Sequence, residues 1–539
     1  MRKLLKKIIA LGVATIALSP IANLVPMASA QEQVLNISTS AEPPTIDPSL
    51  ASDSTSGSII RNVFEGLVTT SQEGEILPGV AESWEVSEDG LVYTFKLRGD
   101  ALWSNGDPVT ANDFVFAWTR VLNPETASEY ASIMYPIKGA EAYNTGEGSV
   151  EEVGIKAVDE TTLEVTLEAP TAYFLELPAF YTFMPVHQAS VEANEDWAMD
   201  AGESYVTNGA FVLSAWNHNA DYQLTKNDQY WDKDNVKLDQ VNVKIIESEA
   251  TANAEFQAGG IDYLGSPYSP VSLDNIEQYR ADGLLQTAPY SAIYWYKLNT
   301  TDEVMANVNI RKALALAIDR QGLIDNVTKG EQIPALGYVP PTIEGFNEDR
   351  GYFADADFEA AKELLAKGLE ELGMQDPAEL NVEISINTSE AHSTIAQFIQ
   401  EGWAKNLGIN ATIRNSEWQV YLDELTSLQY QVGRLGWIAD FNDASTFLDM
   451  YRTADNGNND TGWENADFKA KLDEANKEQD EAKRTQLLVD AEGIIMEELP
   501  VIPLYYYTNN FVAKDTVEGM VPDALGNIDL KNVSIKAAE

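Results

Sequence analysis

The 539-residue sequence contains no cysteine, which excludes disulfide bonds, thiolate metal sites, a cysteine nucleophile and a lipid-modified N-terminal cysteine. It has only three histidines, His187, His218 and His392, and no H-E-x-x-H pair, so we expect no zinc site. Residues 456–460 (NGNND) lack the glycine and ligand spacing of a calcium loop, which predicts a plain polar loop. No G-x-S-x-G motif, P-loop or Rossmann fingerprint occurs, so the sequence indicates no catalytic residue, metal or cofactor.

Basic residues are scarce: 35 Lys and Arg stand against 85 Asp and Glu, for a formal charge of −50. Such a chain repels nucleic acid and anionic membrane surfaces, so we expect neither as a partner. The apolar content of 44% and the charged content of 22% are ordinary for a globular protein. The length is sufficient for two or three lobes, each with its own core.

The N-terminus has the pattern of a secretory signal peptide over residues 1–30. Four bases among residues 2–7 precede an apolar run over residues 8–18, and Ala28-Ser29-Ala30 supplies a small-residue cleavage site. The apolar run is shorter than the about 20 residues that a membrane span needs. We therefore expect export, cleavage after Ala30 and no membrane insertion of the mature chain.

The residue pattern predicts an α/β protein. Alternating or β-rich runs predict strands at 34–38, 92–97, 161–167, 211–224, 241–246 and 410–414. Helical spacing predicts helices at 59–67, 308–327, 358–372 and 394–407. Asp89-Gly90 predicts a hairpin turn, and Thr110 fits a helix N-cap. Helices and strands alternate in the second half of the chain, as they do in an α/β lobe.

Residues 433–443 (GRLGWIADFND) hold the best candidate binding residues. They place Arg434, Trp437 and Asp440 within seven residues, among apolar neighbours. Because buried charges persist only when they are paired, two hypotheses follow. A zwitterionic ligand could pair its amine with Asp440 and its carboxylate with Arg434, or the two side chains could form an internal salt bridge. The residues alone leave both open.

Several segments resemble a known family, among them 78–84 (PGVAESW), 93–98 (YTFKLR), 103–111 (WSNGDPVTA) and 309–320 (NIRKALALAIDR). The sequence resembles the peptide and nickel class of ABC-importer solute-binding proteins, and within it the oligopeptide-binding proteins, over essentially the whole chain after residue 30. The resemblance implies two α/β lobes that close about a hinge, with an extra strand-rich subdomain. Mapped onto this chain, lobe I comprises 31–66, 190–295 and 509–539, the subdomain 67–189, and lobe II 296–508.

The same resemblance implies roles for eight residues. Asp440 corresponds to the anchor of the peptide α-amino group, and Trp437 and Gly436 correspond to the adjacent pocket wall and backbone contacts. Arg434 and His392 correspond to cationic groups that meet the peptide carboxylate at different peptide lengths. Aromatic positions around the ligand correspond to Trp418, Tyr130 and Tyr507.

The implied function is capture of short peptides in a closing cleft, outside the cytoplasm, for delivery to an ABC permease with its ATPase subunits. We expect a monomer that is not an enzyme, in a periplasm or at a cell envelope. Two alternatives stay open: a nickel, heme or opine ligand on the same fold, and a secreted hydrolase of peptides or glycans, for which no nucleophile, base or metal is indicated.

Overall fold

The structure is a computed structural model that describes residues 32–536, so the predicted signal peptide lies outside the described residues. Its largest sheet has six strands in the order β14-β18-β13-β17-β15-β16. Antiparallel pairing joins β13 to β17 and β18, whereas β15 pairs in parallel with both β16 and β17. These strands are Ile333–Pro334, Val501–Tyr506, Ala292–Leu298, Val432–Ile438, Asn381–Asn387 and Asn410–Ser416, in the sheet order given.

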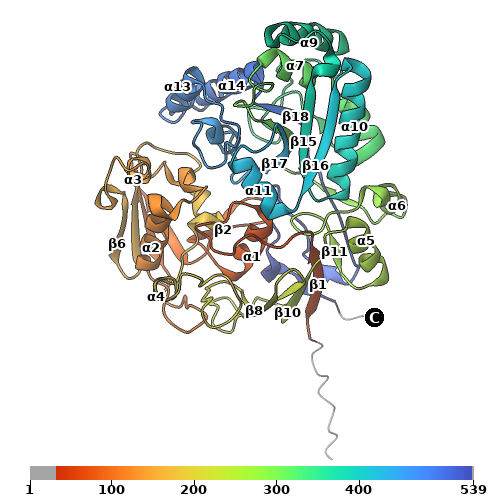
Figure 1. Ribbon diagram of the computed structural model, residues 1–539. Coiled ribbons are helices and arrows are strands. Elements are labelled where there is room, and N and C mark those ends of the chain that lie inside the picture. The colour runs from red at the N-terminus through yellow and green to blue at the C-terminus, as the bar shows by residue number, and fades with distance from the viewer. Residues whose placement is uncertain (1–31, 537–539) are drawn as a thin grey trace, which may run out of the picture. The chain divides into compact units, whose positions relative to one another are not determined.

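Helices cover this sheet, and α10 (Glu390–Leu407) lies alongside β15 and β16 (Figure 1). It packs on α9 (Phe358–Leu372), which in turn packs on α7 (Val308–Leu316). Other helices of this half of the chain are α8 (Arg320–Leu323), α11 (Trp418–Thr426), α12 (Ser445–Leu448), α13 (Ala466–Ala475) and α14 (Glu481–Glu498).

Two smaller sheets contain strands from both ends of the chain: β1 from the N-terminal part and β19 from the C-terminal part. One has the order β1-β10-β9-β8 (Val34–Thr39, Gln240–Ile245, Asp221–Lys226, Phe211–Asn217), and the other the order β11-β19-β12 (Tyr263–Leu264, Asn509–Ala513, Gln286–Ala288). They carry α1 (Ser54–Val63), α5 (Glu249–Ala258) and α6 (Ile276–Ala281). The chain passes from β12 to β13 and from β18 to β19 through short connections, so two adjacent segments join this region to the six-stranded sheet.

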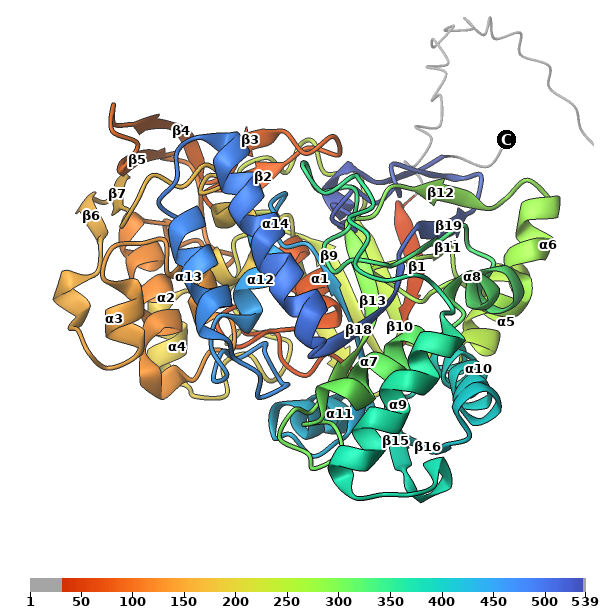
Figure 2. The same cartoon turned by 90° about the horizontal axis from the view of Figure 1, so that it is seen from above.

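A further sheet, β4-β5-β7-β6, lies on the opposite side of the described chain from α5 and α6 (Figure 2). Its strands are Ala81–Val86, Val92–Leu97, Thr162–Thr166 and Ile155–Asp159, and its helices are α2 (Ala111–Leu122), α3 (Ala140–Asn144) and α4 (Gln188–Ala193). Two-stranded ladders complete the strands: β2 (Val68–Thr70) with β3 (Ile76–Pro78), and β20 (Val517–Glu518) with β21 (Ser534–Ile535).

The predicted hairpin turn at Asp89-Gly90 and the predicted helix N-cap at Thr110 are confirmed. Gly90 has φ 71°, a left-handed conformation that glycine adopts at little cost, and it turns β4 into β5. Thr110 begins α2 in a capping box, in which its backbone N–H donates to the Asp113 carboxylate at 2.7 Å. α9 has the predicted bounds because Asp357 caps its start and Gly373, at φ 72°, ends it.

Other helix predictions were wrong in their bounds, and capping explains the differences. α1 begins at Ser54, five residues early, because the Asp53 carboxylate accepts from the backbone N–H groups of Thr55 and Ser56. The single helix predicted at 308–327 is broken after α7, since Asp319 caps a new helix through the Gly322 N–H. α8 then continues into a π-helical turn, Ile324–Thr328.

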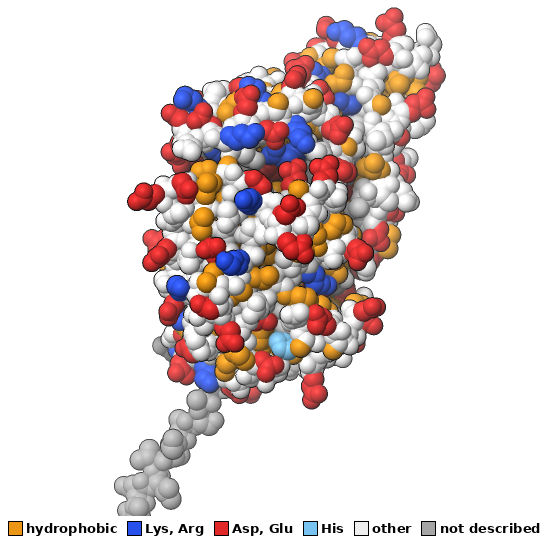
Figure 3. All heavy atoms as spheres, turned by 90° about the vertical axis from the view of Figure 1, so that its left-hand side faces the viewer, with side chains coloured by type: hydrophobic (Ala, Val, Ile, Leu, Met, Phe, Trp, Pro, Cys, Tyr) orange, Lys and Arg blue, Asp and Glu red, His pale blue; other side chains and the backbone are white. Residues whose placement is uncertain are grey.

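The core is rich in tryptophan. Trp118 and Trp403 are fully buried, and their indole N–H groups donate to the carbonyls of Phe183 at 2.8 Å and Leu314 at 3.0 Å. Each such side chain removes about 150–250 Å² from water, worth about 4–6 kcal/mol at about 25 cal/mol per Å². On the face shown in Figure 3, acidic side chains are spread among fewer basic ones, as the composition requires.

Candidate ligand-binding site

A cavity of about 430 Å³ contains all eight residues that the sequence singled out. They come from segments far apart in the chain: Tyr130, His392, Trp418, Arg434, Gly436, Trp437, Asp440 and Tyr507. A volume of this size is typical of small-ligand sites, which span about 300–1,000 Å³. The structure therefore brings the whole predicted set to one place, while each residue's role in binding stays a prediction.

Asp440 follows β17 and carries a carboxylate with hydrogen bonds but no counter-ion. Its Oδ1 accepts from the Tyr130 hydroxyl at 3.2 Å, and its Oδ2 accepts from the Thr446 hydroxyl at 3.1 Å. No salt bridge involves Asp440 within residues 32–536, although the Arg61 guanidinium is near enough to lower its pKa. Burial outweighs these effects and raises the pKa of Asp440 to about 7. The site thus offers a carboxyl group that an incoming cation would ionise.

Arg434 lies on β17 and points to the other side of the cavity lining. Its Nη2 donates to the Tyr507 hydroxyl at 2.9 Å and its Nη1 to the Asn387 side-chain oxygen at 3.3 Å. The guanidinium carbon is 4.7 Å from the ring centroid of Tyr294, a cation–π contact. Its buried Nε has no hydrogen-bond partner among the described residues. The described part of the chain contains no Arg434–Asp440 ion pair, so the internal salt bridge, one of the two hypotheses, is wrong.

Gly436 lies close to its neighbours. A Cβ at this position would come within 3.0 Å of the Ile293 carbonyl oxygen and 3.2 Å of the Tyr507 hydroxyl, so a larger residue would need them to shift. β15 pairs with β17 only at Val432 and Gly433, so the rest of β17, which includes Gly436, has no β15 residue paired with it. Trp437 stacks on Tyr130, with ring centroids 5.9 Å apart and planes 25° apart, and forms a flat apolar wall beside Asp440.

His392 is in the first turn of α10, where Ser389 caps the helix by accepting from the His392 N–H at 3.1 Å. Burial, and then the charge of Arg434, hold the pKa of His392 well below its usual value. Both effects favour the neutral imidazole, whereas the resemblance implied a cationic group. The imidazole Nδ1 lies 3.4 Å from the Tyr294 hydroxyl. A neutral imidazole can still donate a hydrogen bond to a carboxylate through its N–H group.

The two remaining aromatic residues complete the walls. Trp418 begins α11, and its ring centroid lies 6.5 Å from that of Tyr421. Tyr507 follows β18 and contacts both Tyr290 and Tyr294, with centroid distances of 5.9 Å in each case. Because aromatic faces accept many side-chain shapes, these walls suit a ligand class and not one compound.

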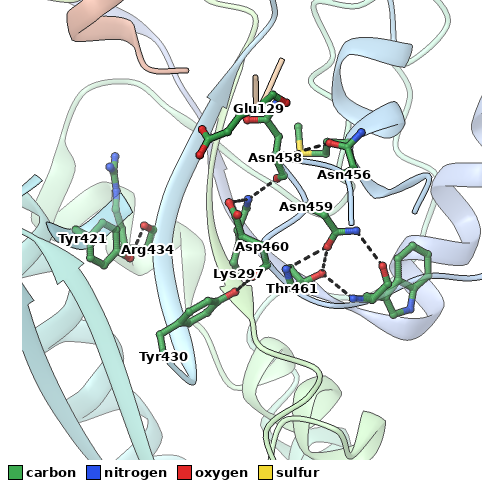
Figure 4. Close-up of polar contacts among 12 residues, drawn as sticks. Glu129, Lys297, Tyr421, Tyr430, Arg434, Asn456, Asn458, Asn459, Asp460 and Thr461 are labelled. Atoms are coloured by element: carbon green, nitrogen blue, oxygen red, sulfur yellow. Dashed lines mark hydrogen bonds and ion pairs between the residues drawn. The ribbon is translucent and has the colours of Figure 1, made fainter. Parts of the chain in front are cut away.

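The sequence analysis missed the charged group formed by Lys297, Asp460 and Glu129 (Figure 4). Lys297 is fully buried on β13, and its Nζ donates to Asp460 Oδ2 and to the Asn458 carbonyl oxygen, each at 2.7 Å. A lysine inside an otherwise apolar strand was the available signal. The 456–460 segment is polar, as predicted, but it also contributes Asp460 to the cavity.

Neither a metal site nor a membrane helix is found in the described residues. No group of three or more His, Asp or Glu side chains between residues 32 and 536 is arranged to hold a metal ion. No helix in that range combines the length and apolar character that a membrane span requires.

Comparison with known proteins gives a consistent result. The profile of the bacterial extracellular solute-binding proteins, family 5 middle region, matches residues 75–459. The oligopeptide-binding protein OppA of Bacillus subtilis is 47% identical over 504 residues, which are 93% of this chain and 92% of that protein. The profile match includes seven of the eight predicted site residues, and Tyr507 lies beyond it.

Two solved structures differ in how well they match. The Haemophilus influenzae OppA in complex with the peptide RPPGFSPFR has a TM-score of 0.89 at 31% identity, covering 94% of this chain and 99% of that one. The murein tripeptide-binding protein MppA in its unliganded open form has a TM-score of 0.64 at 31% identity, covering 94% and 98%. The predicted two-lobed α/β fold is confirmed by the first match, whereas the predicted lobe boundaries stay a prediction.

Proposed function

The chain belongs to family 5 of the bacterial extracellular solute-binding proteins, and we propose that it captures short peptides and delivers them to an ABC importer. The observation that carries the proposal is the cavity with two separated charged groups. Among residues 32–536, Asp440 forms no salt bridge and Arg434 Nε has no hydrogen-bond partner. A peptide brings an ammonium for the first and a carboxylate for the second.

Broad specificity follows from how such a ligand is bound. An extended peptide pairs its backbone with exposed strand backbone, which is independent of side-chain identity. The part of β17 beyond Gly433, which is not paired with β15, offers such a partner. Charge-assisted bonds at the two termini then fix the register, and waters fill the space that short side chains leave, at a cost of about 0–2 kcal/mol each.

The arrangement of the described chain supports a ligand-closed state. It matches the peptide complex of the Haemophilus relative more closely than it matches an unliganded open relative. A ligand favours closure only through contacts that both lobes make with it. Tyr130 and Asp440, which are 310 residues apart, already meet at 3.2 Å beside the proposed amine position.

The protein acts outside the cytoplasm as a monomer without enzymatic activity, and its signal peptide is removed near Ala30. N-terminal sequencing of the exported form tests the cleavage: a start at Gln31 is expected, and a retained Met1 would refute it.

The ligand class is tested by recovering what co-purifies with the native protein. The protein is denatured, and the released compounds are identified by mass spectrometry. Intact peptides of a few residues are expected. Recovery of nickel, heme or an opine with no peptide would refute the peptide assignment. Progressive cleavage of an added peptide pool would instead support the hydrolase.

A further inference from the structure

The charged lining of the cavity is unbalanced. Within the described residues it has six acidic side chains, Asp53, Glu129, Glu247, Glu249, Asp440 and Asp460, against the three basic side chains of Arg61, Lys297 and Arg434. With all six carboxylates ionised and His392 neutral, the formal charge of the lining is 3 − 6 = −3, and it is still −2 when Asp440 is protonated. A peptide with uncharged side chains adds no net charge, so it leaves this excess uncompensated.

The partners of these groups show where the excess lies. Two of the three N–H groups of Lys297 donate to Asp460 and to the Asn458 carbonyl oxygen, and its side chain has no exposed surface. Glu249 accepts from the Ser389 hydroxyl at 2.5 Å and from the Ala391 N–H at 3.2 Å. Glu129, by contrast, forms no salt bridge with any residue between 32 and 536.

Glu129 is held firmly by its backbone. Its carbonyl oxygen accepts from Asn458 Nδ2 at 3.2 Å, and a Cβ at Gly457 would come within 2.5 Å of that oxygen. Figure 4 shows Glu129 beside the pair made by Lys297 and Asp460. The next residue, Tyr130, donates to Asp440, and Glu129 and Asp440 line the same cavity. Burial raises the pKa of Glu129 and Asp460 adds to the rise, while the Ser52 side chain and the charge of Lys297 oppose it.

We propose that Glu129 is a specificity-determining residue that selects peptides with a lysine or arginine side chain within their first three residues. The cation would lie between Glu129 and the Lys297–Asp460 pair and would neutralise the excess charge of the lining. An acidic side chain at the same place would meet Glu129 and Asp460 and would be disfavoured. This inference rests on the proposed peptide function and adds the ligand's charge class to it.

The test uses alanine-based tetrapeptides that carry lysine, norleucine or glutamate at position one, two or three. Norleucine matches the lysine chain without its charge. Calorimetry with the full protein should show lysine binding about tenfold more tightly than norleucine at one position, between the effects typical of exposed and buried ion pairs. Glutamate should bind more weakly than norleucine there.

Glu129→Gln should remove the lysine preference and leave norleucine binding near that of the unmodified protein. Glu125→Gln, which removes an exposed charge from the same loop outside the cavity, is the matched control and should keep the preference. Glu129→Asp should keep part of it, which guards against a folding defect in the glutamine variant.

The outcomes are distinguishable. An equal lysine preference in the unmodified protein and in Glu129→Gln overturns the role of Glu129. No lysine preference at any of the three positions overturns the charge selection while the peptide function stands, because the norleucine peptides still bind. Failure of every peptide to bind overturns the peptide function and this inference with it.

Discussion

Asp440 combines burial with the lack of a counter-ion, and its protonation state follows from both. In the unliganded cavity its pKa is about 7, against 3.8 for an unperturbed aspartate, and burial is the largest cause. Arg61 on α1 and the Tyr130 hydroxyl face the carboxylate and partly offset that effect. Binding an ammonium group requires the ionised form, so proton release and peptide binding are coupled.

We predict that peptide affinity falls as the pH is lowered below about 7, by up to about tenfold per pH unit. The sign follows from the raised pKa: below pH 7 the neutral carboxyl predominates, and a proton must leave before the ammonium binds. Calorimetry at pH 8, 7, 6 and 5 in buffers of different ionisation enthalpy gives the affinity and the protons released. A constant affinity between pH 8 and 6 would contradict the coupling.

The same shift predicts a stability change in the free protein. A raised carboxyl pKa means that stability is lost as the pH rises from about 4 to about 7. Asp440→Asn removes this loss, so at pH 8 without peptide the variant should have a higher free energy of unfolding, by about 1–3 kcal/mol. Denaturant unfolding at pH 8 and pH 4 measures it. A less stable variant at pH 8 would indicate that Asp440 has a structural partner.

Removing the carboxylate charge should weaken peptide binding strongly. Truncating one partner of a desolvated charge pair costs about 2–5 kcal/mol, which is about 30-fold to several thousand-fold in affinity. N-acetylated peptides should bind the unmodified protein poorly for the same reason. Asp440→Asn should lose most of that discrimination. Calorimetry on the unmodified protein and on the variant, each with one peptide in its free and acetylated forms, gives a double-mutant cycle whose coupling energy measures the Asp440–amine contact.

The control for this cycle is Asp443→Asn, three residues along the chain. Asp443 pairs with Arg484 at 2.6 Å and does not line the cavity. That variant should discriminate against acetylated peptides as the unmodified protein does. A coupling energy near zero between Asp440→Asn and acetylation would mean that Asp440 is not the amine anchor.

The residue pattern predicted this site unevenly, for physical reasons. Arg434, Trp437 and Asp440 are close in sequence, so a local pattern shows them together. Glu129 and Lys297 reach the cavity only through tertiary contacts, and no local spacing connects them with residue 440. His392 was identified by resemblance, but its neutral state depends on burial and on Arg434, which a sequence alone does not reveal.

Two helices cap each other across the cavity. The Glu390 carboxylate, at the start of α10, accepts from the Ala250 N–H of α5 at 3.1 Å and from the Ser248 hydroxyl at 2.8 Å. In the opposite direction, the Glu249 carboxylate of α5 accepts from the Ala391 N–H of α10 at 3.2 Å. Each carboxylate thus stabilises the N-terminus of the other helix. In the predicted division of the chain, α5 belongs to lobe I and α10 to lobe II.

Because this contact joins the predicted lobes, it should contribute to the closed state. Glu390→Gln should weaken peptide binding by about 2- to 5-fold, since a charge at a helix N-terminus is worth about 0.3–1 kcal/mol. Calorimetry measures the affinity, and Glu401→Gln, an exposed charge further along α10, is the control. If Glu390→Gln lowers the melting temperature of the free protein and leaves affinity unchanged, the caps belong to the resting fold instead.

At the scale of elements, capping residues decided which predictions were accurate. α9 could be predicted to the residue because Asp357 and Gly373 are strong local signals at its ends. The break between α7 and α8 was missed because apolar spacing continues through it, even though Asp319 caps α8. The next residue, Arg320, is fully buried and donates to the Pro503 carbonyl at 2.8 Å, a contact 183 residues distant in sequence that no local pattern reveals. Strands with clear alternation, such as β1 and β5, were predicted within a residue or two.

Two connections join the β11-β19-β12 sheet to the six-stranded sheet, and we propose that lobe closure takes place there. They consist of residues 289–291 and 507–508 and lie next to each other, because β18 and β13 are neighbouring strands. Tyr507, in the second connection, also bonds to Arg434 inside the cavity. Under this proposal, a ligand on Arg434 acts on a segment that changes conformation when the lobes separate.

Peptide binding should consequently stabilise and compact the protein as a whole. A ligand that binds only the folded state at about 100 times its dissociation constant adds about 2.7 kcal/mol to the free energy of unfolding. The melting temperature should rise, and the radius of gyration in small-angle scattering should fall, because the ligand favours the state in which both lobes contact it. The two readouts separate binding from closure. A rise in melting temperature without compaction would mean that the peptide binds an arrangement that is already closed, and that residues 289–291 and 507–508 do not act as a hinge. The Asp440→Asn variant tests how the amine anchor affects the stability and compaction of the whole protein. It should need far more peptide for the same shift, yet reach the same compact state once saturated, since an asparagine side-chain oxygen can still accept from the Tyr130 hydroxyl.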